Sequence, residues 1–135
     1  MKELSIRAIG RRGERIAARH LKRQGYKIVG KNLHYGKNEL DIIAANKQYL
    51  IFAEVKTRTF ENKEQAVLTR PCLAVDSAKR KRTIEAAKAH LAIHHTELCP
   101  RFDVIEVYLD QSRRYRAFKI NYIEDAFTAS GKFRR

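Results

Sequence analysis

Apolar and polar positions along this chain follow two periods, and together they predict a mixed α/β domain. Apolar residues recur at every third or fourth position in two stretches, which indicates two amphipathic helices. Short runs rich in β-branched and aromatic residues indicate strands. We expect, in chain order, a helix at 13–24 that ends at Gly25, strands at 26–29, 40–45 and 48–57, a helix from Asp76 or Ser77 to about 95, strands at 102–109 and 115–120, and a short helix capped by Asn121 and ending at 127.

The order of these elements predicts an α/β fold, with a single mixed β-sheet flanked by helices. At 135 residues the chain is long enough for one compact domain, and its 44% of hydrophobic residues supply a core. We therefore expect a single domain over residues 1–135. Polar stretches predict a turn at 31–38 and a long loop at about 58–75, and residues 132–135 predict a basic C-terminal tail.

Three charged residues, Asp41, Glu54 and Lys56, interrupt the apolar strands. Glu54 and Lys56 are two positions apart, so both side chains leave the same face of a strand. If the hairpin turns at residues 46–47, Asp41 lies opposite Phe52, on that same face and diagonal to Glu54. A slip of one residue would move Asp41 to the other face, so the proposed cluster depends on this register.

Two carboxylates within reach of one cation, beside an ammonium group, suit metal-assisted phosphodiester hydrolysis. Asp41 and Glu54 would bind Mg²⁺ or Mn²⁺, and Lys56 would stabilise charge in the transition state. Glu39 is expected on the same face, either as an outer ligand or as a solvated residue. The alternative is a structural Glu–Lys ion pair beside an unrelated acid, but the apolar residues that flank both acids favour a site.

The charge of the chain points to a nucleic-acid partner. Lys and Arg number 29 against 15 Asp and Glu, for a net charge of +14, and such a field attracts polyanions. Phosphate contacts position a duplex without reading its bases, so we expect a preference for shape. The candidate phosphate contacts are Arg11, Arg12, Lys37, Arg58, Lys79, Arg80 and Arg82.

Other functional classes lack support in the sequence. The chain has no P-loop, no GxGxxG motif and no Ser-His-Asp pattern, and its histidines lack zinc-ligand spacing. Residues 1–10 do not form a signal peptide, and no apolar run is long enough to span a membrane. Cys72 and Cys99 are far apart and are expected to be reduced. We therefore expect a cytoplasmic protein without a membrane partner.

Several motifs along the chain also resemble the YraN-like family of small bacterial endonuclease-like proteins. That family falls within the PD-(D/E)XK nuclease superfamily and is similar, more distantly, to archaeal Holliday-junction resolvases. The resemblance covers nearly the whole chain, with Asn38 in place of a family glycine. The motifs that carry it are Gly13-Glu14-Arg15-Ile16-Ala17-Ala18, Gly25-Tyr26 with Asn32, Asn38-Glu39-Leu40-Asp41-Ile42-Ile43, Phe52-Ala53-Glu54-Val55-Lys56-Thr57-Arg58 and Arg101-Phe102-Asp103-Val104.

The resemblance implies a restriction-endonuclease-like fold with an αβββαβ core and an active site for DNA cleavage. It assigns Asp41 and Glu54 as metal-binding acids, Lys56 as the motif lysine, and Glu14 as an acid that faces the site from the first helix. From the sequence alone, a solvated helix residue is the preferred explanation of Glu14. A homodimer is implied only by analogy, because symmetric junction cutting needs two sites related by a two-fold axis.

Two functional hypotheses follow. The favoured one is a metal-dependent endodeoxyribonuclease that acts on DNA, including branched or junction DNA. The other is a non-catalytic nucleic-acid-binding module with a vestigial nuclease core. Only the first predicts metal-dependent cleavage products, whereas both predict salt-sensitive binding.

Overall fold

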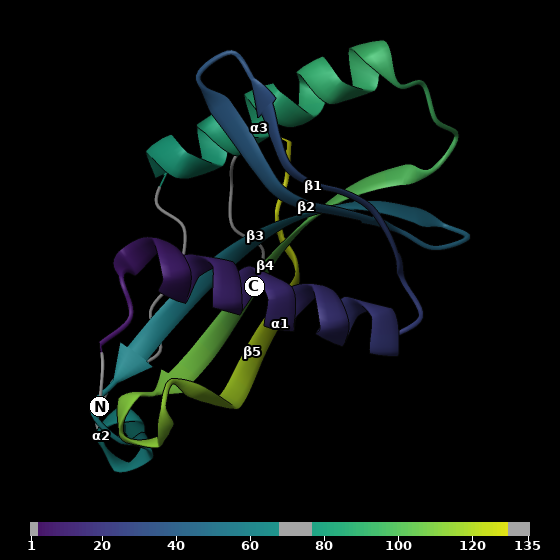
Figure 1. Ribbon diagram of the computed structural model, residues 1–135. Helices are drawn as coiled ribbons and strands as arrows, with labels where there is room; N and C mark the ends of the chain where they lie inside the picture. Colours follow the sequence, from purple (N-terminus) through teal and green to yellow (C-terminus); the bar gives the residue numbers. More distant parts are fainter. Residues whose placement is uncertain (1–2, 68–76, 130–135) are drawn as a thin grey trace.

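The computed structural model describes residues 3–67 and 77–129, which form a five-stranded mixed sheet with helices on both faces (Figure 1). The strand order is β1-β2-β3-β4-β5, and neighbouring strands are antiparallel except for the parallel pair β3 and β4. The expected α/β class and single mixed sheet are confirmed. The elements are α1 (Ile6–Arg23), β1 (Lys27–Tyr35), β2 (Asn38–Ala45), β3 (Tyr49–Phe60), α2 (Lys63–Val67), α3 (Ser77–Ile93), β4 (Cys99–Asp110), a 3-10 turn (Gln111–Arg113) and β5 (Arg116–Phe127).

The long helices α1 and α3 cover opposite faces of the sheet, and each buries a separate half of the core. Leu21 of α1 packs with Ile51 and Ile105 in one apolar cluster, and none of the three is exposed. Ile84 of α3 and Phe52 of β3 belong to the cluster on the other face. Each such side chain contributes about 1.5–3 kcal/mol through burial, so the two layers together hold β3 at the centre of the sheet.

Helix α1 begins seven residues earlier than the sequence pattern predicts. Ser5 caps it, accepting a hydrogen bond from the Ala8 N–H at 3.1 Å, and the first two turns are mostly polar or exposed. Such turns show little amphipathic periodicity in the sequence, which explains why the predicted helix began too late. The helix ends as expected, since Gly25 follows it with a φ of 93°.

The edge strands are both longer than predicted. The stretch at 31–38, predicted as a turn, is strand except for a tight turn at Gly36 and Lys37, where Gly36 has a φ of 63°. The predicted helix over 121–127 is wrong, because these residues continue β5. Strand β4 is buried along residues 101–110 and needs a partner for its backbone groups, which β5 supplies from the outer side.

The β2–β3 register differs from the prediction by two residues. Ile43, rather than Asp41, lies opposite Phe52, because four residues, 46–49, separate the paired Ala45 and Leu50 at the turn. Asn46 fixes that turn, since its side-chain oxygen accepts hydrogen bonds from the N–H groups of residues 48 and 49 at 2.9 and 2.7 Å. A shift of two residues preserves the face of every side chain, so Asp41 and Glu54 stay on a common face.

The expected loop at 58–75 is partly regular structure. Strand β3 extends to Phe60, and α2 occupies residues 63–67. Residues 68–76, with Asp76 and Cys72, and the basic tail at 132–135 lie outside the described residues. Helix α3 starts at Ser77 as predicted and ends at Ile93. Within the described part of the chain, no helix is long and apolar enough to cross a membrane.

Gly13 sets how closely α1 approaches β3. A Cβ atom at this position would lie 1.8 Å from Oγ1 and 2.9 Å from Cβ of Thr57, so only glycine fits without movement of the helix. Gly10, one turn earlier in the same helix, has nothing within 4 Å of the corresponding position. The Gly13 contact therefore draws the first half of α1 onto the β3 segment that follows Glu54.

We predict opposite effects of alanine at these two glycines. Gly13→Ala should lower the free energy of unfolding by about 1–3 kcal/mol through overpacking. Gly10→Ala should raise it by about 0.5–1 kcal/mol through helix propensity. Urea denaturation followed by circular dichroism measures both variants, and equal effects of the two substitutions would contradict the packing described here.

Candidate metal and phosphodiester site

The candidate site lies where β2 parts from β3. The two strands pair from Ala45 and Leu50 to Ile42 and Ala53, and their pairing ends there. In the next position along β2, the carboxylate of Asp41 accepts a hydrogen bond from the backbone N–H of Val55 at 2.9 Å. The carboxylate is thus held in the fork between the strands, level with Glu54 rather than diagonal to it.

Glu54 is buried with only half of its carboxylate satisfied. Its side chain is on β3, and the residue is 3% exposed. Oε1 lies 3.1 Å from Nζ of Lys79, in the first turn of α3. Oε2 is buried and has no hydrogen-bond partner among the described residues. An unpaired carboxylate oxygen out of water is unfavourable, so this atom marks a place where a cation would be stabilised.

Both carboxylates have a raised proton affinity, chiefly because they are buried. Burial, followed by the charge of Glu54, raises the pKa of Asp41 to about 7, against the opposing effects of the Val55 N–H and Lys79. Burial also raises the pKa of Glu54, although Lys79 and then Lys56 lower it. Such a pair favours a divalent cation, because the ion removes the repulsion that otherwise protonates one of the acids.

Lys79 is the nearest ammonium group to Glu54. Burial alone would lower its pKa, but the charge of Glu54 and the ion pair outweigh burial, so the pKa is raised and the side chain is cationic. Lys56 also acts on Glu54 from two residues along β3, and it is half-buried. The sequence assigned the motif position to Lys56 and gave Lys79 only a phosphate contact. The structure places both near the same carboxylate.

Two further acids surround the pair. The charge of Glu14, on α1, contributes to the raised pKa of Asp41, and the charge of Glu39, on β2, contributes to that of Glu54. Both residues are half-buried. Glu14 therefore lies near enough to Asp41 for its charge to act on that carboxyl, since the glycine before it lets α1 lie directly against β3.

The donor set fits a hard cation with an incomplete protein shell. No group of three or more His, Cys, Asp or Glu side chains within residues 3–67 and 77–129 forms a ready-made metal cage. Asp41 and Glu54 supply two carboxylates as possible ligands for one metal ion. Mg²⁺ is commonly bound in this way, with water and substrate phosphate oxygens completing the shell. The unpartnered Oε2 of Glu54 fits such an ion.

The other six predicted phosphate contacts differ in their surroundings. Two have protein partners: Arg12 donates to the backbone carbonyl of Arg114 at 2.7 Å, and Arg58 lies 3.4 Å from Glu106. These two side chains have a structural contact of their own. Arg80 is half-buried. The remaining three are exposed and lie on α1, at the β1–β2 turn and on α3: Arg11, Lys37 and Arg82.

A second buried acid in the sheet, Asp103, has hydrogen-bond partners for both of its carboxylate oxygens. Asp103 on β4 accepts two hydrogen bonds from Arg101, at 2.9 and 2.8 Å. It also accepts one from the Tyr122 hydroxyl at 2.5 Å and one from the Asp125 N–H at 2.8 Å. The Arg101 to Val104 motif therefore belongs to the scaffold.

Comparison with known sequences agrees with the motif resemblance. The profile of Uncharacterised protein family UPF0102 matches residues 13–107, a range that contains Glu14, Asp41, Glu54 and Lys79. This match bears out the YraN-like family resemblance read from the motifs.

Relatives from distant bacteria match over most of their length. The chain is 38% identical over 128 residues to a UPF0102 protein of Caldanaerobacter subterraneus subsp. tengcongensis, covering 94% of this chain and 100% of the relative. It is 40% identical over 118 residues to one of Porphyromonas gingivalis, covering 87% and 82%. It is 39% identical over 128 residues to one of Chlorobaculum tepidum, covering 92% and 95%.

The raised pKa of Asp41 predicts a pH-dependent stability without metal. Its pKa when folded, about 7, lies above the unfolded value, so the stabilisation is complete below about pH 4 and is lost as pH rises through 7. Asp41→Asn keeps an acceptor for the Val55 N–H and avoids this loss. At pH 8 in EDTA the variant should be more stable than the parent by about 1–2 kcal/mol.

Denaturation at pH 8 and pH 4 tests this effect, and the difference between variant and parent should shrink at pH 4. Glu97→Gln is the matched control, because the Glu97 side chain is 97% exposed and its removal should change little at either pH. A parent whose stability does not fall between pH 4 and pH 8 relative to Asp41→Asn would contradict the burial of the pair.

Lys79 competes with a metal ion for Glu54, so its removal should strengthen metal binding. Lys79→Gln should bind Mn²⁺ about 5–10-fold more tightly at pH 8, since a partly exposed ion pair is worth roughly 1 kcal/mol. Calorimetric titration of parent and variant measures this difference. Weaker binding to the variant would show instead that Lys79 supports the ion.

Proposed function

Because the chain belongs to the uncharacterised protein family UPF0102 and carries a buried acid pair at its β2–β3 fork, we propose that it is a metal-dependent endodeoxyribonuclease of the PD-(D/E)XK type. Asp41 and Glu54 would hold Mg²⁺ or Mn²⁺, and the substrate would be DNA, including branched or junction forms. The observation that carries the proposal is the buried Oε2 of Glu54, which has no hydrogen-bond partner within residues 3–67 and 77–129, beside the charge of Asp41.

The chemistry follows from the groups at the fork. A bound divalent ion would acidify a water molecule and neutralise charge on the phosphate. Asp41 and Glu54 would hold that ion, and Asp41 would remain oriented by the Val55 N–H. Lys56 would stabilise the negative charge that builds on the phosphate oxygens. Glu14, from α1, would accept hydrogen bonds from water at the site.

Lys79 gives the site a resting state. In the metal-free protein, Nζ of Lys79 lies 3.1 Å from Oε1 of Glu54 and offsets the negative charge of that carboxylate. An incoming metal ion would displace Lys79 from Oε1. The freed ammonium group would then meet a substrate phosphate. Lys79 can thus serve both in the role that the sequence predicted, as a phosphate contact, and as a partner of the acid in the metal-free protein.

DNA is the substrate class that the charge supports. The chain carries +14, and exposed basic residues lie on the β1–β2 turn and on α3. Phosphate contacts of this kind favour shape over sequence. If the substrate is a four-way junction, two copies of the chain would be needed, and we include a homodimer in the proposal on that ground alone.

A non-catalytic nucleic-acid-binding module is the second candidate. The observation in its favour is the Glu54–Lys79 ion pair, which satisfies one oxygen of the metal-binding acid from within the protein. This hypothesis predicts DNA or RNA binding that needs no metal and survives the loss of Asp41.

Cleavage assays separate the two hypotheses. Labelled linear, flapped and four-way DNAs should be nicked in Mn²⁺ or Mg²⁺ and not in EDTA. Asp41→Asn and Glu54→Gln should each lower the rate at least 100-fold, because each removes a metal ligand. Glu97→Gln should cut like the parent. Binding measured in EDTA should be unchanged or stronger in the acid variants, since they lose negative charge. If both acid variants cut as fast as the parent, the proposed chemistry is wrong.

A further inference from the structure

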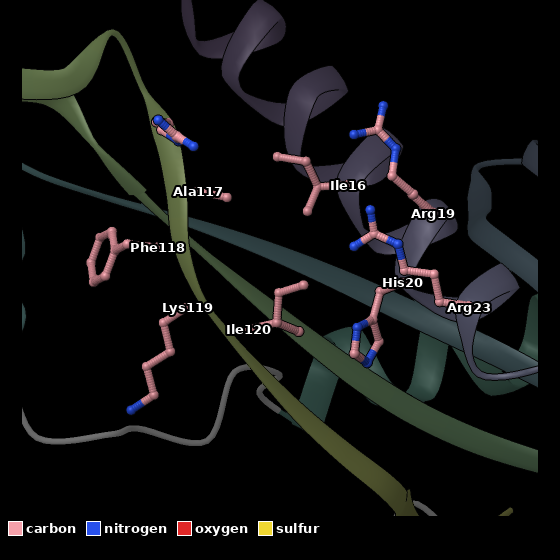
Figure 2. A pocket seen from close by; sticks show the side chains of 9 residues that line it. Ile16, Arg19, His20, Arg23, Ala117, Phe118, Lys119 and Ile120 are labelled. Atoms are coloured by element: carbon pink, nitrogen blue, oxygen red, sulfur yellow. The ribbon is translucent and has the colours of Figure 1, made fainter.

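A groove runs between α1 and β5 (Figure 2). It encloses about 550 Å³ and is lined by Ile16, Arg19, His20 and Arg23 of α1 and by residues 116–120 of β5. Figure 2 shows His20 between the helix and Ile120, with Arg19 and Arg23 along the helix side. Glu14, whose charge acts on Asp41, precedes Arg19 by five residues, roughly 140° around the helix.

An arginine ladder follows the same helix. Every fourth residue of α1 is arginine, all five are exposed, and successive members are ~6 Å apart along the axis. No described carboxylate forms an ion pair with any of them, in contrast to Arg58 and Arg101. The ladder consists of Arg7, Arg11, Arg15, Arg19 and Arg23.

Such a row is unfavourable in the isolated protein. Like charges four residues apart on a helix repel one another, and α1 offers only Glu14 as an acid to offset them. A linear polyanion bound along the helix would offset this repulsion, because each guanidinium group can bind a phosphate in a bidentate manner. The regular spacing favours a ligand with a regular charge repeat.

The groove beside the ladder adds features that suit a base. Ile16, Ala117 and Ile120 give it apolar walls. His20 is the aromatic side chain of α1 that lines the groove, and its ring lies 5.7 Å from that of Tyr122, which lines the adjoining pocket. Proteins that bind single strands combine a positive track for the backbone with aromatic rings on which bases stack.

We propose that the ladder and the groove form a second nucleic-acid site, which binds a single-stranded segment along α1 with its phosphates on Arg19 and Arg23 and a base against His20. The inference rests on the proposed function in taking DNA as the ligand, but it does not depend on the metal chemistry. It implies that the preferred substrate carries an unpaired arm, held in a groove whose lining includes neither Asp41 nor Glu54.

Fluorescence anisotropy with a labelled single-stranded 20-mer, in EDTA, tests the site. Arg19→Glu with Arg23→Glu should raise the Kd at least 10-fold and flatten the slope of log K against log salt by about 1.4, the value for two lost single-strand phosphate contacts. Lys22→Glu with Lys88→Glu changes the same charge, and Lys22 shares the last turn of α1, yet neither lysine lines the groove. This control should raise the Kd less than 3-fold. His20→Ala should raise it about 5-fold, through lost stacking.

Crosslinking of the parent protein keeps the test independent of how the variants fold. A 5-iodouracil-substituted single strand, irradiated with the parent in EDTA, should attach at His20 or Tyr122. Attachment only at the β1–β2 ribbon or at α3 would overturn the proposal, as would equal loss of binding in the arginine variant and its control. Displacement of DNA by polyglutamate of equal charge and at equal concentration would also overturn it, since it would show a general anion surface.

The outcomes also distinguish this inference from the proposed function. Strand binding that is lost in the arginine variant but kept in Asp41→Asn supports the second site, whether or not DNA is cut. Cleavage of linear duplex at the parent rate by the arginine variant, with strand binding unaltered, would refute the second site and leave the nuclease proposal intact.

Discussion

Two carboxylates of like charge are held out of water at the point where β2 parts from β3, and the rest of the site is arranged around that repulsion. Burial raises the pKa of both acids, and the charge of Glu54 adds to the effect on Asp41. Lys79, Lys56 and the Val55 N–H offset part of the unfavourable energy. One oxygen of Glu54 is left buried without a partner in the described residues. Buried pairs that are partly satisfied destabilise a fold, so their presence is best explained by a ligand that completes them.

Asp103 makes the contrast clear within the same sheet. It is fully buried and receives four hydrogen bonds from Arg101, Tyr122 and the Asp125 backbone. Glu54, on the neighbouring strand, has a single ion pair for one of its oxygens. The fold can therefore satisfy a buried carboxylate completely where the residue is structural. The scaffold around β3 and β4, with α1 drawn in by Gly13, holds Glu54 in place without completing its shell.

Strand alternation was sufficient to predict that Asp41, Glu54 and Lys56 share a face, because this conclusion depends only on whether the register shift is even. The register itself was not predictable, since it is set by how Asn46 folds the turn at 46–49. The predicted edge strands were shorter than the observed ones, because the half-exposed residues of β1 and β5 resemble turn or helix residues in composition. The place of Lys79 could not be read from the sequence either. The position of Lys79 depends on where α3 starts relative to β3. Residues 79–82 are all basic, so the sequence does not indicate which of the four side chains lies near Glu54.

The most direct test of the account is crystallographic location of the metal. In crystals soaked with Mn²⁺, anomalous scattering should show one ion bound by Asp41 and Glu54, with carboxylate oxygens at about 2–2.3 Å. Nζ of Lys79 should have moved away from Oε1 of Glu54. Manganese absent from the fork at saturating concentration, with the Glu54–Lys79 pair still intact, would contradict the claim that this buried acid pair is a metal site.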